Sequence, residues 1–258
     1  MSEYATLLAA NGTLQRPAWL QPDMARTLRK YFVAPSLPVL HRRCKLRWTT
    51  TSLDELMADP GRDAAANHLI TGFPHDVPGF HPLREQLLRE FTFRPELRAR
   101  AAARLAQVVR DANLTAPVFV GVHVRRTDYA AWMERSVRGH LVGFDYLYRA
   151  MALMRRRWPT AAFVVTSDDL GWCRRALRGR DVFLVGDRDV RRPGADLALL
   201  AACNHSILTH GTFGFWAGYL AGGQVVAPAG YGQRPTRLDE DVERAGLGWT
   251  RLKAFVYS

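Results

Sequence analysis

The chain has 258 residues, of which 48% are hydrophobic, and it carries a formal net charge of +12 that comes mostly from arginine. The ordinary apolar content and the absence of low-complexity tracts exclude an intrinsically disordered chain, and the length suffices for one large α/β domain or two smaller ones. No stretch approaches the roughly 18–20 consecutive apolar residues that a membrane span needs.

The first half of the chain predicts helices and irregular segments. Apolar residues recur there at helical spacing, and the expected helices cover residues 3–10, 23–32, 53–57, 83–91 and 96–112. The last of these, rich in alanine and arginine, leads into Thr115-Ala116-Pro117. We expect a domain boundary at this point, which separates residues 1–115 from residues 116–258.

The second half alternates strands with helices. Continuous apolar, β-branched runs are typical of strands buried on both faces, and they occur at residues 118–124, 162–166, 182–185, 206–209 and 224–228. Helical patterns lie between them, at residues 144–158, in a short segment that ends at 177, at 197–202 and at 213–221. This alternation predicts an α/β fold with a Rossmann-type, mostly parallel sheet and helices on both faces. Ligands bind such sheets at the carboxyl ends of the strands.

The basic charge favours anionic partners: nucleic acids, anionic membranes or phosphorylated ligands. The arginines are spread over predicted helix surfaces, as in Arg155-Arg156-Arg157, and no recognition helix or Cys/His finger accompanies them. A solvated basic surface is therefore favoured, and a nucleic-acid-binding module is kept as an alternative. The cysteines Cys44, Cys173 and Cys203 are too few and too scattered for a disulfide scaffold or a zinc site, and we expect Cys173 and Cys203 in the core.

The first chemical signal is the segment from His123 to Tyr129, which reads His-Val-Arg-Arg-Thr-Asp-Tyr at the end of a predicted strand. Arg125 and Arg126 cannot both point into an apolar sheet, so at least one projects into the crevice above the strand ends. Guanidinium groups bind phosphate in a bidentate manner, and Asp128 is placed to pair with one of them. A plain Arg–Asp ion pair is the alternative reading. For His123, a hydrogen-bonded place in the core is expected.

The second signal follows the fourth predicted strand, where Gly211, Thr212 and Gly214 open a helix. Small residues let a ligand approach the backbone amides at a helix start, where anions are favoured. A phosphate or nucleotide site and simple tight packing are both consistent with this pattern. Asp196 is expected to cap the preceding helix. Neither G-x-G-x-x-G nor G-x-x-x-x-G-K-[ST] occurs, which disfavours the usual dinucleotide and P-loop sites.

The third signal, Ser167-Asp168-Asp169, follows the second predicted strand. Its carboxylates suit a metal ion, a ribose or a base, and a surface turn is the alternative. No H-E-x-x-H, nucleophile elbow or serine–histidine pairing competes with these three segments.

A family resemblance rests on segments of the second half, Val118–Arg126, Phe163–Ser167, Trp172–Arg174 and Asp196–Gly223, and continues more weakly through Glu3–Leu7, Leu37–His41 and Gly72–Pro74. Together they resemble the galactoside α-1,2-fucosyltransferases. The resemblance implies a two-lobed, GT-B-like fold with a Rossmann-type donor domain. It also implies GDP-fucose as donor, a galactose-terminated glycan as acceptor, inversion at the anomeric carbon, and no required metal or cofactor. Such enzymes are type II proteins of the Golgi membrane.

The resemblance also assigns roles to residues. The family's donor-binding motif matches His123, Arg125, Arg126 and Asp128, and its second conserved block matches Thr212 and Phe213. Together with the signals above, we expect Arg125, Arg126 and Asp128 to be catalytic. The expected donor-binding residues are His123, Arg125, Arg126, Thr166, Ser167, Asp168, Asp196, Gly211, Thr212 and Phe213. The catalytic base stays open between Asp128, Glu134 in the following segment, and no strong base at all.

Two departures from the family pattern matter. Thr127 stands where the family usually has glycine; the related α-1,6 enzymes have threonine there. The family's Gly-rich G-R-L-G-N-Q segment precedes the Glu-Tyr-Ala-Thr stretch, and here Met1 comes just after it. We therefore expect residues 1–115 to be an N-terminally truncated acceptor-side lobe without a membrane anchor, and residues 116–258 to be the GDP-fucose-binding domain. A catalytically impaired sugar-nucleotide binder is the alternative to an active enzyme.

Overall fold

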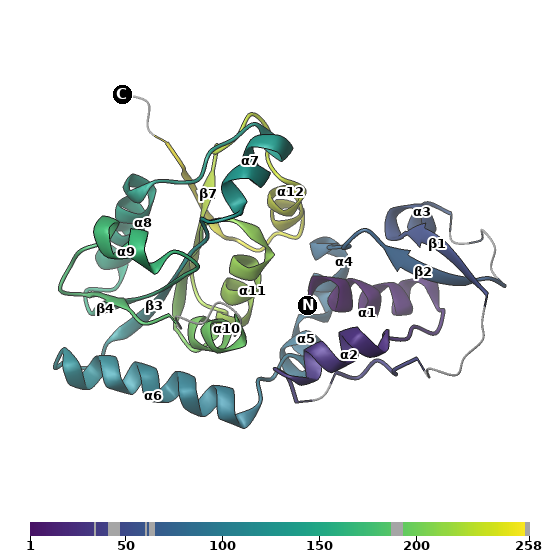
Figure 1. Cartoon of the computed structure of the whole chain (residues 1–258), viewed down its shortest axis with the longest axis horizontal. Coiled ribbons are helices and arrows are strands. Elements are labelled where there is room, and N and C mark those ends of the chain that lie inside the picture. Colours follow the sequence, from purple (N-terminus) through teal and green to yellow (C-terminus); the bar gives the residue numbers. More distant parts are fainter. Residues whose placement is uncertain (34, 41–46, 60, 62–64, 187–192, 256–258) are drawn as a thin grey trace. The chain divides into compact units, whose positions relative to one another are not determined.

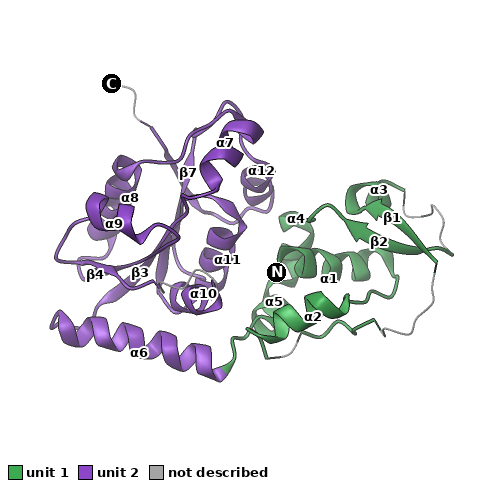
Figure 2. Cartoon of the chain, in the orientation of Figure 1, with its two compact units in different colours: residues 1–94 green, residues 95–258 purple. Residues whose placement is uncertain are grey.

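The computed structural model describes residues 1–33, 35–40, 47–59, 61, 65–186 and 193–255, so Cys44 lies outside the described part. The chain divides into two compact units, residues 1–94 and 95–258 (Figure 2). The division falls before the expected boundary at residue 115 because helix α6 (Pro95–Asp111) packs against helix α10 (Pro193–Ala201) and so belongs to the second unit. An acceptor-side role for the first unit stays a prediction.

The first unit consists of short helices and a small sheet. Its helices are α1 (Ser2–Leu14), α2 (Pro22–Arg29), α3 (Leu53–Ala58), α4 (Val77–Phe80) and α5 (Arg84–Glu90), with a 3-10 turn at His81–Leu83. Strands β1 (Trp48–Ser52) and β2 (Asn67–Thr71) pair in parallel, and neither was expected from the sequence. Both strands are polar and poorly buried, so they lack the apolar run by which buried strands are recognised.

The core of the first unit is aromatic and contains one buried carboxylate. The Tyr4 ring lies edge-on to Phe91 at 5.6 Å, and Phe32 contacts Phe91 at 5.0 Å. The Tyr4 hydroxyl donates to Glu90, and the Ser36 hydroxyl donates to the other Glu90 oxygen at 2.6 Å. Tyr4 is one of the residues that carry the family resemblance, and these contacts show that it stabilises the core of the first unit.

The second unit contains a six-stranded, all-parallel sheet in the order β5-β4-β3-β6-β7-β8. Its strands are β3 (Val118–Val124), β4 (Ala161–Ser167), β5 (Val182–Leu184), β6 (His205–Ile207), β7 (Val225–Ala229) and β8 (Thr250–Lys253). Numbered within the unit, this order is 3-2-1-4-5-6, that of Rossmann folds. The expected α/β fold with a parallel sheet is confirmed, and β8 is an additional strand that the sequence did not indicate.

Helices cover both faces of this sheet (Figure 1). They are α6, α7 (Tyr129–Val137), α8 (Phe144–Arg157), α9 (Leu170–Ala176), α10, α11 (Gly211–Ala221) and α12 (Arg237–Arg244). On one face, alternate β3 residues such as Val122 pack in one hydrophobic core with α7 and α8 residues such as Met133 and Met151. On the other face, Gly121 lies so close to α10 that an added Cβ would come within 3.0 Å of Leu200. Side chains from β3 therefore alternate between two helical layers, as predicted for a doubly covered sheet.

Two local expectations are corrected. Asp196 does not cap α10, because that helix begins at Pro193 and places Asp196 in its first turn; proline at the first helical position favours this earlier start. The fourth strand spans His205–Ile207 rather than residues 206–209. Cys173 and Cys203 are buried, as expected. Within the described part of the chain, no helix has both the length and the apolarity for a membrane crossing.

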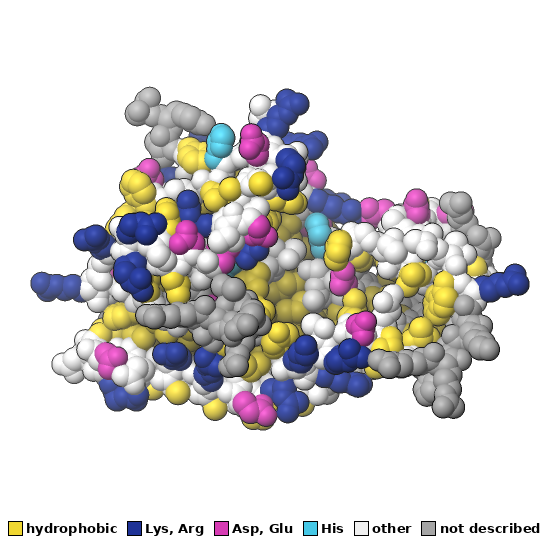
Figure 3. All heavy atoms as spheres, in the orientation of Figure 1, with side chains coloured by type: hydrophobic (Ala, Val, Ile, Leu, Met, Phe, Trp, Pro, Cys, Tyr) yellow, Lys and Arg dark blue, Asp and Glu magenta, His cyan; other side chains and the backbone are white. Residues whose placement is uncertain are grey.

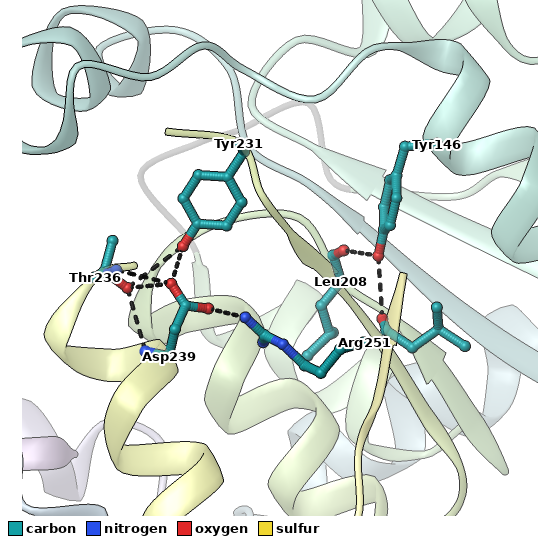
Figure 4. Close-up of polar contacts among 7 residues, drawn as sticks. Tyr146, Leu208, Tyr231, Thr236, Asp239 and Arg251 are labelled. Atoms are coloured by element: carbon teal, nitrogen blue, oxygen red, sulfur yellow. Dashed lines mark hydrogen bonds and ion pairs between the residues drawn. The ribbon is translucent and has the colours of Figure 1, made fainter. Parts of the chain in front are cut away.

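A buried polar network joins the last strand to the rest of the second unit (Figure 4). Asp239, in the first turn of α12, accepts hydrogen bonds from the Tyr231 hydroxyl and the Thr236 backbone and forms an ion pair with Arg251 on β8. Burial alone raises the pKa of Asp239, but Arg251 and the bonds from Thr236 and Tyr231 outweigh it and hold that pKa below its usual value. The network thus links β8, α12 and the segment that follows β7.

Candidate active site

Arg125 and Arg126 follow β3 directly, at the point where the strand order reverses. The chain continues from β3 to β4 on one side, and it returns to pair with β3 through β6 on the other. The Arg125 N–H donates to Thr209 Oγ1 at 2.9 Å, so the segments after β3 and β6 are bonded to one another. Such a switch point is where open α/β sheets bind their ligands.

The Arg125 guanidinium is held by two carboxylates. Its Nη2 lies 2.7 Å from Asp128 Oδ1, and its Nη1 lies 3.1 Å from Asp168 Oδ2. The Asp168 side chain is only 11% exposed, so this second ion pair is the better shielded one. The expected Arg–Asp pairing is confirmed for Arg125, whose charge is offset within the protein.

The Arg126 guanidinium has a different environment. Its Cζ lies 3.8 Å from the ring centroid of Trp172, on α9, and its backbone N–H donates to Asp168 Oδ1 at 2.9 Å. Among the described residues, no carboxylate pairs with this guanidinium. A guanidinium stacked on a ring keeps its charge and its in-plane N–H donors. Of the two arginines, Arg126 therefore has the charge that is available to an anion.

The Ser167-Asp168-Asp169 segment makes its bonds within the protein. Asp168 Oδ2 accepts from the Thr127 hydroxyl at 2.5 Å, in addition to the Arg125 and Arg126 contacts. Asp169 Oδ1 accepts from the backbone N–H of Trp172 at 2.8 Å and so caps α9. Within the described residues, no group of three or more His, Cys, Asp or Glu side chains is arranged to hold a metal ion.

His123 is buried directly below the arginines. It is 4% exposed, and its ring lies 5.3 Å from that of Phe213. Burial, with a smaller effect of the Arg125 charge, lowers the pKa of His123 to about 3, so the ring is neutral near pH 7. The expected core position is confirmed, but Nδ1 has no hydrogen-bond partner in the described part of the chain. An added Cβ on Gly214 would lie 2.7 Å from this Nδ1, so the close approach of α11 depends on glycine.

The amino terminus of α11 opens beside Arg125. Gly211 has a φ of 87°, and His210 at the N-cap position makes no side-chain capping bond. Instead, His210 Nε2 accepts from the Val142 N–H at 3.2 Å, and its ring stacks with Tyr129 at 5.8 Å. The first N–H groups of a helix have no partner within the helix and favour anions. As expected, small residues form the start of this helix, which begins at Gly211. Thr209, two residues earlier, accepts the hydrogen bond from the Arg125 backbone.

Other expected site residues lie apart from this arrangement or are covered. Thr166 is 1% exposed within β4, and Ser167 is 8% exposed at its end. Asp196 lines a small cavity of about 10 Å³ together with Arg100 and Arg104 of α6. Glu134 is exposed on α7. The contacts of these residues with a donor stay predictions.

Three residues at the site were not among the expected ones: Thr209, Trp172 and Tyr129. Thr209 follows β6 and lies opposite the end of β3. This proximity could not be predicted from the sequence, because it depends on β6 being the neighbour of β3 in the sheet. Trp172 lies in the first turn of α9, the helix after Ser167-Asp168-Asp169. Tyr129 could have been found from the sequence, because it comes directly after Asp128. Its ring packs on Gly211 at the start of α11.

Comparisons with known proteins identify the family of this chain. The family model described as glycosyl transferase family 11 matches residues 1–251. Relatives include galactoside 2-alpha-L-fucosyltransferase SEC1 of Bos taurus, 38% identical over 236 residues, with 90% of this chain and 64% of the relative covered. Galactoside alpha-(1,2)-fucosyltransferase 1 of Sus scrofa is 40% identical over 238 residues, with 90% and 65% covered. The chain thus spans somewhat less than two thirds of the length of these relatives. It belongs to glycosyl transferase family 11.

Proposed function

We propose that this chain is a galactoside α-1,2-fucosyltransferase, which transfers L-fucose from GDP-fucose to a galactoside hydroxyl with inversion and without a metal ion. The family and the names of its relatives support the reaction class. The observation that carries the proposal is the Arg126 guanidinium, which lies at the sheet's switch point without a carboxylate partner among the described residues. Such a guanidinium suits a diphosphate.

The proposed chemistry requires stabilisation of departing GDP. The bond between the fucose anomeric carbon and the β-phosphate oxygen breaks, and its electron pair leaves with GDP. The acceptor oxygen bonds to the opposite face of that carbon and loses its proton. Negative charge thus grows on the β-phosphate, where Arg126 and the α11 N–H groups would offset it. Removal of one such group typically costs about 100- to 1,000-fold in rate.

Two carboxylates are candidates for the base. Asp128 is 72% exposed but is ion-paired with Arg125, whereas Glu134 is exposed on the next helix. Asp128→Asn and Glu134→Gln variants separate these roles, since only loss of the base removes the acidic limb of the pH–rate profile, along which the rate falls as the base becomes protonated. If neither variant does so, the acceptor proton leaves late, after the oxocarbenium-like transition state has formed.

The finer features of the enzyme are also part of the proposal. They are a GT-B-like, two-lobed arrangement, an acceptor-side role of the first unit, and a place in the Golgi. The first unit contains a cavity of about 910 Å³ to which Trp19 and Trp48 contribute. Indole rings suit the apolar faces of sugars, which supports an acceptor-side role.

The alternative of a nucleic-acid-binding module gains no support from the face that Figure 3 shows. Figure 3 shows Lys and Arg side chains scattered over the face in view, with Asp and Glu among them, and no continuous basic stripe. A binding surface that follows a phosphate backbone gathers its basic residues on one face or along a helix.

The test uses the full chain with GDP-fucose and a β-galactoside, with the product linkage determined by NMR. We expect α-1,2 product and a loss of at least about 100-fold in kcat/KM for Arg126→Ala, with an unchanged thermal midpoint. The control is Arg157→Ala. Arg157 lies over Trp158 at 5.9 Å, before β4 rather than after it, so its loss should leave turnover intact. Near-native turnover of Arg126→Ala would defeat the proposal. GDP binding without transfer would indicate a non-catalytic binder instead.

A further inference from the structure

The side chain of Arg126 needs an external restraint if it is to bind a diphosphate well. A free arginine side chain samples many rotamers, and part of this conformational entropy is lost on binding. Arg125 is restrained by ion pairs with Asp128 and Asp168. The side chain of Arg126, in contrast, contacts the Trp172 ring, with 3.8 Å between its Cζ and the ring centroid.

Trp172 is itself held in place by the end of β4. Asp169 caps α9 by accepting the backbone N–H of Trp172, and the backbone N–H of Asp169 donates to Ser167 Oγ at 2.9 Å. Ser167 is the last residue of β4 and is in register with Val124, the last residue of β3. The backbone from which the indole extends is therefore positioned by the same strand pair from which the arginines extend.

The backbone of Arg126 is held by the neighbouring carboxylate. Asp168 Oδ1 accepts the Arg126 N–H at 2.9 Å. Two consecutive carboxylates thus hold the backbones of the stacked pair: Asp168 accepts the backbone N–H of Arg126, and Asp169 accepts that of Trp172.

Stacking differs from ion pairing in what it leaves for a ligand. A carboxylate partner would offset the charge of Arg126 and occupy its N–H donors. A ring face attracts the cation and leaves the in-plane donors unoccupied. We propose that Trp172 is a positioning residue, which orients the Arg126 guanidinium so that its N–H edge binds the pyrophosphate of GDP. This inference rests on the proposed function, in which Arg126 is the ligand of that pyrophosphate.

The test measures the affinity of the full chain for GDP by titration calorimetry. Trp172→Leu should weaken binding by roughly 2- to 30-fold, the equivalent of a cation–π contact of about 0.5–2 kcal/mol. Trp172→Phe keeps a ring and should lie between Trp172→Leu and the native chain. The matched control is Trp158→Leu, which removes a tryptophan that also lies under an arginine, Arg157, and should leave GDP affinity unchanged.

A double-mutant cycle separates positioning from general damage to the fold. If Trp172 acts through Arg126, Trp172→Leu has no further effect in a chain that already carries Arg126→Ala. An equal loss of affinity in both backgrounds would overturn the inference, and so would native affinity of Trp172→Leu. If Trp172→Leu does not fold, Trp172→Met replaces it in the same cycle.

The outcomes distinguish this inference from the proposed function. If the native chain does not bind GDP, or if Arg126→Ala binds it as tightly, both fail. If Arg126→Ala weakens GDP binding and Trp172→Leu does not, the positioning role of Trp172 fails and the proposed function stands.

Discussion

The backbone N–H of Arg125 and the hydroxyl of Thr209 form a 2.9 Å hydrogen bond between the segments that follow β3 and β6. These strands are neighbours in the sheet but far apart in the sequence. The bond joins the two parts of the chain with the strongest chemical signals, the arginine pair and the start of α11. The candidate site is therefore built across the switch point and not within one segment.

Loss of this bond should loosen the site. Thr209 is 7% exposed, so Thr209→Val leaves the Arg125 N–H without its acceptor in a largely buried place. We expect a loss of about 1–3 kcal/mol in the free energy of unfolding, measured in urea, and a weaker affinity for GDP. Thr209→Ser keeps the hydroxyl and serves as the control. Equal stability of the valine and serine variants would contradict a role for this bond.

Much of the second unit was predictable from its sequence. Strands β3, β4 and β7 are buried, apolar and rich in β-branched residues, and those patterns identified them. Strand β8 was missed because its residues, Thr-Arg-Leu-Lys, show no apolar run. Its place depends on partners that are distant in sequence, as the Asp239–Arg251 pair shows. Local propensity does not contain that information.

The candidate site was predictable in part. The rule that ligands bind at carboxyl ends of parallel strands identified Arg125, Arg126 and the start of α11. It did not distinguish the two arginines, because that difference depends on which side chain reaches Asp128 and which reaches Trp172. Side-chain direction of this kind follows from backbone geometry after the strand end, where no periodicity applies.

Asp168 should matter for catalysis through its contacts with the arginine segment. Its side chain binds Arg125, the Arg126 backbone and Thr127. Asp168→Asn removes the charge and one acceptor, so we expect a fall of about 10- to 100-fold in kcat/KM, equivalent to about 1.4–2.7 kcal/mol.

The matched control for this change is Asp181→Asn. Asp181 binds Arg155 at 2.6 Å, but it precedes β5 and so lies at the opposite end of the sheet. The control should affect stability alone and leave kcat/KM near its native value. If both variants lower kcat/KM equally, the effect is one of general stability rather than of site geometry.

Two buried histidines should make stability depend on pH. Burial lowers the pKa of His123 and that of His210 to about 3 each, whereas the unfolded chain has histidine pKa values of about 6.5. Between these values the unfolded state binds more protons, so stability is fully present above pH 6.5 and is lost as pH falls toward 3.

Each histidine contributes a slope of up to about 1.4 kcal/mol per pH unit within that window. Urea unfolding at pH 7.5, 6 and 5 measures the slope. His123→Gln and His210→Gln should each remove about half of it, and the double variant should remove most of it. A slope that stays unchanged in the double variant would show that other groups cause the acid sensitivity.

Gly214 should not tolerate a side chain. A Cβ at this position would lie 2.7 Å from His123 Nδ1, closer than non-bonded atoms approach. Since both residues are buried, we expect Gly214→Ala to cost about 1–3 kcal/mol in unfolding free energy. Gly12→Ala is the control, because Gly12 lies inside α1 and nothing lies within 4 Å of its added Cβ. Native stability of Gly214→Ala would mean that His123 moves aside without cost.

The Asp239–Arg251 pair should be strongly coupled, because Asp239 has a buried carboxylate (Figure 4). Arg251→Met leaves that carboxylate without its charged partner, and only the bonds from Tyr231 and Thr236 remain. We expect a loss of about 3–5 kcal/mol for this change. Asp239→Asn in the same chain removes the unpaired charge, so the double variant should be less destabilised than the sum of the single ones, by about 1–3 kcal/mol. Urea unfolding of the four chains measures this coupling. Strict additivity would mean that the ion pair contributes little and that β8 is held by its backbone pairing with β7.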